Sequence, residues 1–156
     1  MLLRSIEPSD IDAVLAMNAA DVDKLAPLTP ERLNWIVSMS RHALVADDDG
    51  CVAGFVMTLP PGAAYDSHNY AWFSERYSDF VYLDRIIVSA MHRRRGVAGL
   101  LYDRVEADAA GSRVQLEVNW NPPNHPSLAF HGARGYVEID RFGNAVMYEK
   151  PVNAPQ

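Results

Sequence analysis

Residues 81–101 read VYLDRIIVSAMHRRRGVAGLL: an apolar run passes into a basic, glycine-containing turn, which opens an amphipathic pattern. Backbone N–H groups at a helix N-terminus lack helical partners and carry partial positive charge, so a turn opened by Gly96 can direct several of them at phosphate oxygens. Arg93, Arg94 and Arg95 would add charge-assisted hydrogen bonds. The segment therefore predicts a strand, a pyrophosphate-binding turn and a helix.

The pattern after this turn is typical of a helix packed on a sheet. Apolar side chains recur at helical spacing, and charged side chains take the opposite side. The apolar set is Val97, Leu100, Leu101 and Val105, and the charged set is Asp103, Arg104, Glu106 and Asp108. Residues 114–120, VQLEVNW, then alternate apolar and polar side chains as in a strand, with Glu117 on the polar side.

Two motifs in this half of the chain resemble those of a known family. Arg93-x-x-Gly96-x-Ala98 matches the Q/R-x-x-G-x-G/A signature of the GCN5-related N-acetyltransferases, the GNAT superfamily. Downstream, the pattern resembles the family's N-x-x-A-x-x-L-Y-x-x-x-G-F helix, here written Asn124-x-x-Ser127-x-x-Phe130-His131-x-x-x-Gly135-Tyr136. The resemblance covers residues 80–148, nearly half the chain.

The resemblance implies a single-domain α/β fold: a mixed, mainly antiparallel sheet of about seven strands flanked by about four helices, with splayed central strands. It implies acetyl-CoA as cosubstrate, without a metal. The backbone of Ile86, Ile87 and Val88 would bind the pantetheine arm. The pyrophosphate would lie on Arg93, Arg94, Arg95, Gly96, Val97, Ala98 and Gly99, with Asn124, Ser127 and Phe130 beside the cofactor.

The same resemblance indicates two catalytic candidates. Glu117 matches a glutamate that deprotonates the amine through water in ribosomal-protein alanine N-acetyltransferases; the alternative is a polar residue on the outer face of a strand. His131 replaces the family's usual thiolate-protonating tyrosine, and imidazole is a good donor only when charged. The alternative for His131 is an exposed helix residue. Asn124 can cap the helix that follows it as well as contact the cofactor.

These features predict an acetyl-CoA-dependent N-acetyltransferase that moves the acetyl group directly to a primary amine of a small molecule, an amino acid or a peptide N-terminus. The alternative is a non-catalytic acyl-CoA-binding or sensing domain. Aromatic and acidic side chains on the long connection 60–79 and near it are candidates for the acceptor side. They are Tyr65, Tyr70, Trp72, Phe73, Tyr77 and Trp120, with Glu75, Asp79 or Asp84 attracting a cation.

Length and composition limit the number of domains, the partners and the compartment to be expected. A chain of 156 residues is long enough for one domain, expected over 1–150 with a tail over 151–156. The net charge of −6 disfavours nucleic acid and anionic membrane as partners, and the single cysteine, Cys51, and the lack of a signal-like segment favour the cytoplasm. The sequence leaves a homodimer open.

The remaining elements follow from local signals. We expect a strand over 2–6, a helix capped by Ser9, and a second helix from Thr29 with Pro30 in its first turn. Strands over 43–46 and 52–58 flank the turn Asp47-Asp48-Asp49-Gly50. A loop is expected over 60–79, and strands over 136–140 and 145–149 complete the series.

Overall fold

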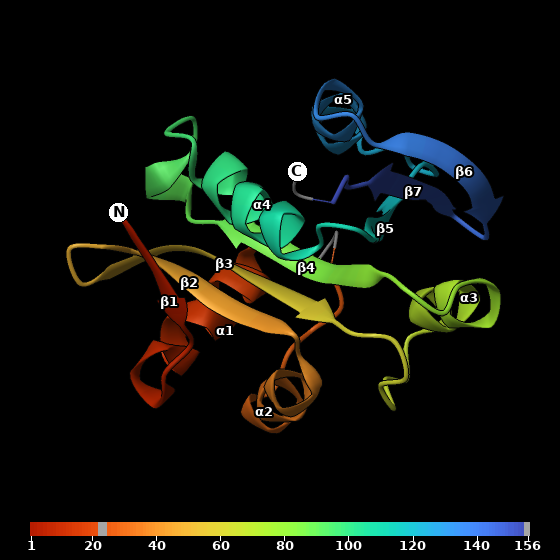
Figure 1. Cartoon of the computed structure of the whole chain (residues 1–156). Helices are drawn as coiled ribbons and strands as arrows, with labels where there is room; N and C mark the ends of the chain where they lie inside the picture. The colour runs from red at the N-terminus through yellow and green to blue at the C-terminus, as the bar shows by residue number, and fades with distance from the viewer. Residues whose placement is uncertain (22–24, 155–156) are drawn as a thin grey trace. The chain divides into compact units, whose positions relative to one another are not determined.

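The computed structural model describes residues 1–21 and 25–154. Its strands are β1 (Leu2–Ser5), β2 (His42–Asp48), β3 (Cys51–Leu59), β4 (Val81–Val88), β5 (Arg113–Asn119), β6 (Val137–Phe142) and β7 (Ala145–Pro151). Its α-helices are α1 (Ile11–Ala20), α2 (Pro30–Met39), α3 (His68–Arg76), α4 (Val97–Asp108) and α5 (His125–Ala133), with 3₁₀ helices η1 (Pro8–Asp10) and η2 (Ala90–His92) (Figure 1).

The strands form one sheet in the order β1-β2-β3-β4-β5-β7-β6. The pairs β1–β2, β2–β3, β5–β7 and β6–β7 are antiparallel. By contrast, β4 and β5 are parallel, with Val81 opposite Val114 and Tyr82 opposite Gln115. The predicted α/β architecture with a mixed, mainly antiparallel seven-stranded sheet is therefore confirmed, with five α-helices in the described ranges where about four were expected.

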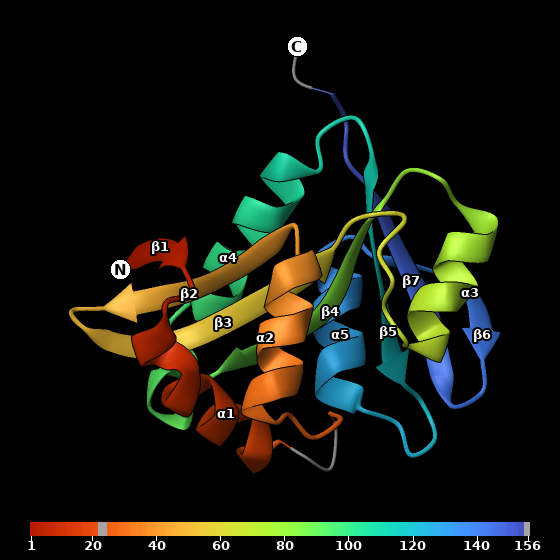
Figure 2. The ribbon, with the colours of Figure 1, turned by 90° about the horizontal axis from the view of Figure 1, so that it is seen from below.

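The chain divides into two compact units. The first contains Met1–Pro60 and Leu83–Val105, and the second contains Pro61–Tyr82 and Glu106–Gln156. In the first unit, α1 and α2 cover one face of β2 and β3, while α4 lies on the other face (Figures 1 and 2). Gly54 in β3 permits close packing there, because an added Cβ would lie 2.8 Å from the Ile87 carbonyl oxygen and 3.1 Å from Val97 Cγ1.

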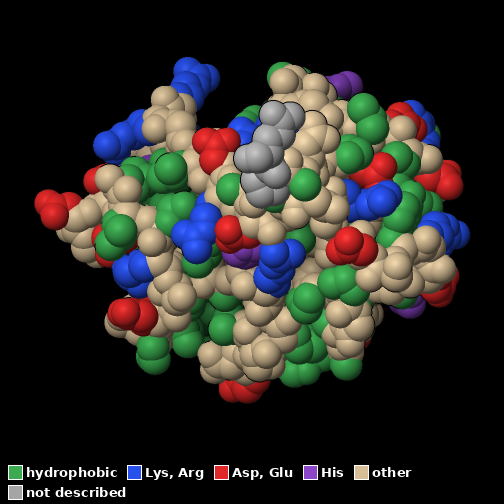
Figure 3. Space-filling view, in the orientation of Figure 1, with side chains coloured by type: hydrophobic (Ala, Val, Ile, Leu, Met, Phe, Trp, Pro, Cys, Tyr) green, Lys and Arg blue, Asp and Glu red, His purple; other side chains and the backbone are tan. Residues whose placement is uncertain are grey.

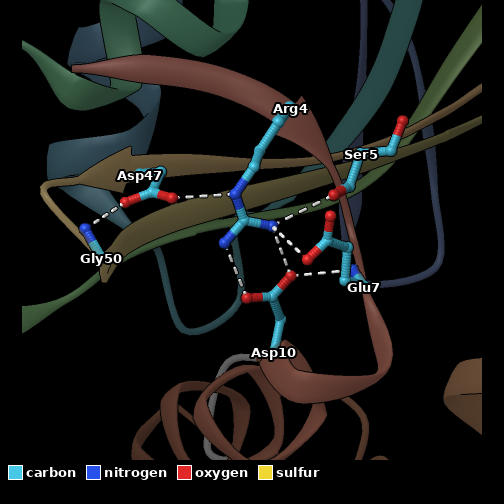
Figure 4. Close-up of polar contacts among 6 residues, drawn as sticks. All are labelled: Arg4, Ser5, Glu7, Asp10, Asp47 and Gly50. Atoms are coloured by element: carbon cyan, nitrogen blue, oxygen red, sulfur yellow. Dashed lines mark hydrogen bonds and ion pairs between the residues drawn. The ribbon is translucent and has the colours of Figure 1, made fainter.

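A polar cluster fixes the edge of the first unit (Figure 4). Arg4 on β1 donates from Nη1 and Nη2 to the two carboxylate oxygens of Asp10, at 2.7 and 2.9 Å, and from Nε to Asp47 at 2.8 Å. The Arg4 guanidinium accordingly lowers the pKa of both Asp10 and Asp47. The cluster joins β1, η1 and the β2–β3 hairpin.

The hairpin turn and the second helix form as their sequences predict. Asp49 and Gly50 both have positive φ, 53° and 90°, as a tight two-residue hairpin requires. Thr29 caps α2 by accepting a hydrogen bond from the backbone N–H of Arg32 at 3.1 Å. The predicted Ser9 cap is wrong: η1 precedes α1, and Asp10 occupies the N-cap position.

The second unit contains the main departure from expectation. The connection expected as a loop over 60–79 contains α3, whose first turn is capped by Ser67 accepting from the Tyr70 N–H at 3.2 Å. Tyr70, Trp72 and Phe73 are buried. Their burial outweighs the turn-forming composition of the segment, which local rules read as irregular.

Candidate active site

The turn that leads into α4 has the geometry of an anion-binding site. We call residues 92–96 the phosphate turn. Within it, Arg94 and Gly96 have positive φ, 63° and 78°. Backbone N–H groups in such turns form a concave nest for anions, and α4 begins directly afterwards at Val97. The turn thus presents N–H groups of a helix N-terminus next to three arginines.

The three arginine side chains of the phosphate turn reach into solvent. Arg93, Arg94 and Arg95 are exposed, and Figure 3 shows basic side chains protruding at this end of the molecule. Arg93 lies 4.0 Å from Asp21, and Arg95 lies 3.7 Å from Asp48. Exposed pairs at such distances are weak, so a phosphate can compete for both guanidinium groups. The residues present therefore fit a pyrophosphate.

The strand before the turn places the three residues expected at the pantetheine arm. Ile87 is buried in the first unit, and Ile86 and Val88 are half-buried. At the end of the strand, the Ser89 N–H donates to the Ala53 carbonyl of β3 at 2.8 Å. After the turn, Val97 is buried and Ala98 and Gly99 are half-buried in the first turn of α4. These cofactor contacts stay predictions.

Glu117 lies in the second unit and has a specific partner. The buried Tyr82 hydroxyl is 2.7 Å from Glu117 Oε1 and 2.8 Å from Oε2, so one phenol donates to both carboxylate oxygens. Glu117 itself is half-buried. This arrangement fixes the position of the carboxylate, because the single phenolic proton is shared between its two oxygens.

The face of β5 that carries Glu117 is covered. Gln115, two residues earlier on the same face, is fully buried. The ring of Tyr82 packs against Tyr70 and Phe73 of α3, with centroids 5.3 and 5.7 Å apart. Glu117 is therefore half-buried on a face that α3 helps to cover, and its catalytic role stays a prediction.

His131 is buried, at 6% exposure, which excludes the alternative of an exposed helix histidine. Its Nδ1 lies 2.7 Å from the Ser127 carbonyl oxygen, and its ring stacks on Tyr148 and meets the edge of Tyr136. A carbonyl only accepts, so Nδ1 carries the proton of the neutral ring. Burial lowers the pKa of His131 below its usual 6.5, against the opposing effect of the Ser127 carbonyl.

The two catalytic candidates lie on opposite faces of the second unit. Tyr148, on which His131 stacks, is opposite Leu116 in the β5–β7 register, and Glu117 is opposite Met147. Adjacent strand residues point to opposite faces. Glu117 is consequently on the α3 face and His131 on the α5 face. A base for the amine and an acid for the leaving thiolate act on two atoms bonded to the same acetyl carbon, so both side chains would have to reach one substrate from these two faces.

The helix that carries His131 begins as predicted. Asn124 caps α5, and its side-chain oxygen accepts from the Ser127 N–H at 3.4 Å. Ser127 also lies beside the imidazole, with Oγ 3.2 Å from His131 Nδ1. Phe130 is 37% exposed. The structural role of Asn124 is thus clear, and its role toward the cofactor stays a prediction.

Three of the six aromatic residues expected on the acceptor side are buried in the second unit. Tyr70, Trp72 and Phe73 are the buried side chains of α3 itself. Tyr77 and Glu75 instead line a cavity of about 530 Å³ at the C-terminal end of α3. The cavity is completed by Pro61, Gly62, Ser74, Arg76, Ser78 and Phe80.

Sequence reasoning missed two groups of polar residues. Tyr82 gives no local signal, because its partner Glu117 is 35 residues away and meets it only through the pairing of β4 with β5. Likewise Glu106, expected on a charged helix face, is buried and accepts from Arg134, Tyr136 and Lys150. Such contacts depend on strand and helix placement across long sequence separations.

The fold and the anion-binding turn are those expected of an acyl-CoA-dependent acyltransferase. The model of the acetyltransferase (GNAT) family matches residues 13–136, and the chain belongs to this family. It is an acetyltransferase that uses acetyl-CoA. No curated protein sequence matches the chain.

Several solved structures share the fold of this chain. The crystal structure of Ard1 from Thermoplasma volcanium has a TM-score of 0.75 at 18% identity, covering 97% of both chains. NAA60 from Arabidopsis thaliana in complex with acetyl-CoA has a TM-score of 0.72 at 17% sequence identity, covering 97% of this chain and 99% of the NAA60 chain. Ribosomal-protein-alanine N-acetyltransferase from Brucella melitensis has a TM-score of 0.69 at 20% sequence identity, covering 97% of this chain and 100% of its own. At these identities the likeness shows the fold.

Within the described ranges, none of the helices is both long and apolar enough to cross a membrane.

Proposed function

We propose that the protein transfers the acetyl group of acetyl-CoA directly to the α-amine of a peptide, with residues 1–150 acting as one N-acetyltransferase domain. The observation that carries this proposal is the Tyr82–Glu117 pair, a half-buried carboxylate held by a phenol at 2.7 and 2.8 Å. Acetyl-CoA supplies an acetyl group already activated as a thioester. The protein must therefore bind the phosphates, remove a proton from the amine and return one to the thiolate.

Glu117 is the proposed base. Its ionised carboxylate accepts a proton from the ammonium form of the acceptor, directly or through water, so that the neutral amine can form the new C–N bond as the C–S bond breaks. Tyr82 is a positioning residue, since its hydroxyl orients both carboxylate oxygens. Positioning matters because a base must lie within hydrogen-bonding reach of the proton it takes.

His131 is the proposed partner of the leaving thiolate. Because Nδ1 faces the Ser127 carbonyl, proton transfer would take place at Nε2. The lowered pKa of His131 means that the imidazolium fraction is small at neutral pH. We therefore expect its contribution as an acid to grow as the pH falls toward 6.

An α-amine suits this base better than a lysine side chain. An α-amino group has a reference pKa of about 7.7 to 8.0, against about 10.4 for lysine, so a carboxylate base removes its proton at a much smaller energetic cost. NAA60, whose structure holds acetyl-CoA, and a ribosomal-protein-alanine N-acetyltransferase share the fold, and the latter's name describes transfer to an alanine amine. Small-molecule amines with a similarly low pKa fit the same chemistry.

The test uses two sets of peptides. One set has a free N-terminus and no lysine, and varies in its first two residues; the other has a blocked N-terminus and one lysine. Mass spectrometry after incubation with acetyl-CoA should show a 42 Da increase only in the first set. Acetylation of the lysine set alone would contradict the α-amine assignment. Acetyl-CoA binding without transfer to any amine would favour the alternative of a non-catalytic acyl-CoA-binding domain.

A further inference from the structure

His92, the first residue of the phosphate turn, connects Ser89 to Asp48 through hydrogen bonds within the first unit. The Ser89 hydroxyl lies 2.6 Å from Nδ1 of His92, and Nε2 of His92 lies 3.1 Å from Oδ2 of Asp48. His92 is buried, at 5% exposure. Both ring nitrogens of this buried imidazole therefore have a polar partner, which is the condition for burying such a group at low cost.

The chemistry of the partners defines the direction of these hydrogen bonds. An ionised carboxylate only accepts, so Nε2 of His92 carries a proton and donates to Asp48. In the neutral ring Nδ1 is then an acceptor and receives the Ser89 hydroxyl proton. These hydrogen bonds run from the end of β4, through η2, to the end of β2.

Asp48 also reaches the other end of the phosphate turn. The same Oδ2 atom that accepts from His92 lies 3.7 Å from Nη1 of Arg95. One carboxylate oxygen on the β2–β3 hairpin thus contacts the first and the fourth residue of the turn.

The turn needs such external support because its backbone is strained. Arg94 has φ 63°, a left-handed conformation that is unfavourable for a residue with a Cβ. Residues in this conformation persist where the surrounding structure fixes them, and they occur preferentially at ligand-binding sites. The phosphate turn can present its N–H groups only in this shape, so whatever holds the shape also prepares the anion site.

We propose that His92 is a positioning residue for CoA binding, which holds the phosphate turn in its anion-binding shape by linking Ser89 to Asp48. The proposal rests on the proposed function, because it assigns the phosphate turn to the CoA pyrophosphate. His92 itself does not contact the phosphates. Its loss leaves the arginine charges unchanged but allows the turn to sample shapes in which the N–H groups no longer converge.

The test measures binding of CoA by isothermal titration calorimetry, which requires no knowledge of the acceptor. His92→Ala should weaken CoA binding about tenfold, equivalent to about 1.4 kcal/mol. His92→Gln should recover affinity to within about threefold of wild type, because the glutamine Nε2 donor lies the same number of bonds from the backbone as the histidine Nε2.

His42→Ala is the matched control. His42 is equally buried in the same unit and has one comparable contact, Nδ1 to Thr58 Oγ1 at 2.7 Å, but it lies at the opposite end of β2 from Asp48. Its substitution should lower the melting temperature and leave the Kd for CoA within about twofold. If His92 had a purely structural role, the two alanine variants would have similar Kd values for CoA.

The outcomes are distinguishable. Wild-type protein that binds CoA, together with a His92→Ala variant of unchanged Kd, would overturn the inference and leave the proposed function intact. Equal weakening by His92→Ala and His42→Ala would also overturn it, since the effect would then follow stability. Wild-type protein that binds no CoA would overturn the proposed function, and the inference with it.

Discussion

The phosphate turn in the first unit and the Glu117 face of β5 in the second unit differ in how they would act on the substrates. The turn relies on backbone conformation: two residues of positive φ and a helix N-terminus, with arginines exposed around them. The Glu117 face relies on one half-buried side chain fixed by another, at 2.7 and 2.8 Å. In the proposed function, binding and chemistry would therefore depend on different kinds of structure. Substitutions in the two regions should change different kinetic constants.

The largest effect is expected on the chemical side. Glu117→Gln keeps the size of the side chain and a hydrogen-bond acceptor for Tyr82 but removes the base. It should lower kcat for peptide acetylation about 100-fold or more, within the range usual for loss of a general base. Steady-state kinetics with saturating acetyl-CoA measures this directly. A kcat within threefold of wild type would remove Glu117 from the mechanism.

The next effect is expected on the binding side. Gly96→Val places a β-branched residue at φ 78°, and nothing lies within 4 Å of the added Cβ, so the change acts through the backbone alone. A left-handed conformation costs a residue with a Cβ roughly 1–2 kcal/mol, so the Kd for CoA should rise about tenfold. Gly96→Asn is the control, since asparagine tolerates this conformation and should stay near wild type. Equal Kd values for wild type and Gly96→Val would contradict the assignment of the turn.

A smaller loss of kcat is expected from Tyr82→Phe. The ring that packs against Tyr70 and Phe73 is kept, and only the hydroxyl that holds Glu117 is lost. Losing one hydrogen bond to a charged group should reduce kcat about tenfold while the Kd for CoA stays unchanged. Tyr77→Phe, on the same unit but at the cavity beside α3, provides the comparison. If both variants keep the wild-type kcat, Tyr82 has no positioning role.

The smallest effect concerns stability at acidic pH. Folding lowers the pKa of His131, chiefly through burial, so the unfolded chain binds a proton at a higher pH than the folded chain does. The free energy of unfolding should accordingly fall as the pH drops below the unfolded-state pKa of about 6.5. The total loss is about 1.4 kcal/mol for each unit by which folding lowers the pKa. His131→Gln should lose less stability than wild type between pH 7.5 and 5. Parallel urea-unfolding curves for the two proteins at both pH values would contradict this.

The shape of the phosphate turn could be predicted from the sequence better than the surroundings of Glu117, for a physical reason. A phosphate-binding turn is local: its glycine, its arginines and the helix after it are neighbours in sequence, and residues 81–101 contain nearly all of it. What the local pattern could not show is the support from Asp48, which is 44 residues from His92 and reaches the turn through the hairpin.

The Glu117 face is assembled from distant segments. Glu117 was predicted as a candidate from a strand pattern and a family resemblance. Its partner Tyr82 reaches it only through the parallel pairing of β4 with β5. The ring of Tyr82 in turn packs against α3, which lies in a connection expected to be a loop. The alternation in VQLEVNW predicted a polar, solvent-facing side of the strand. On that side, however, Gln115 is fully buried and Glu117 is half-buried. Likewise, the departure at His131 was visible in the sequence, but its burial depends on contacts with Tyr136 and Tyr148.

The measurement that tests the separation of binding from chemistry most directly is calorimetric titration of acetyl-CoA into the Glu117→Gln variant. We predict a Kd within about twofold of wild type in a protein whose turnover has fallen about 100-fold. A Kd weakened tenfold or more would contradict it, because Glu117 would then be required for acetyl-CoA binding and its loss of activity could not be assigned to the missing base.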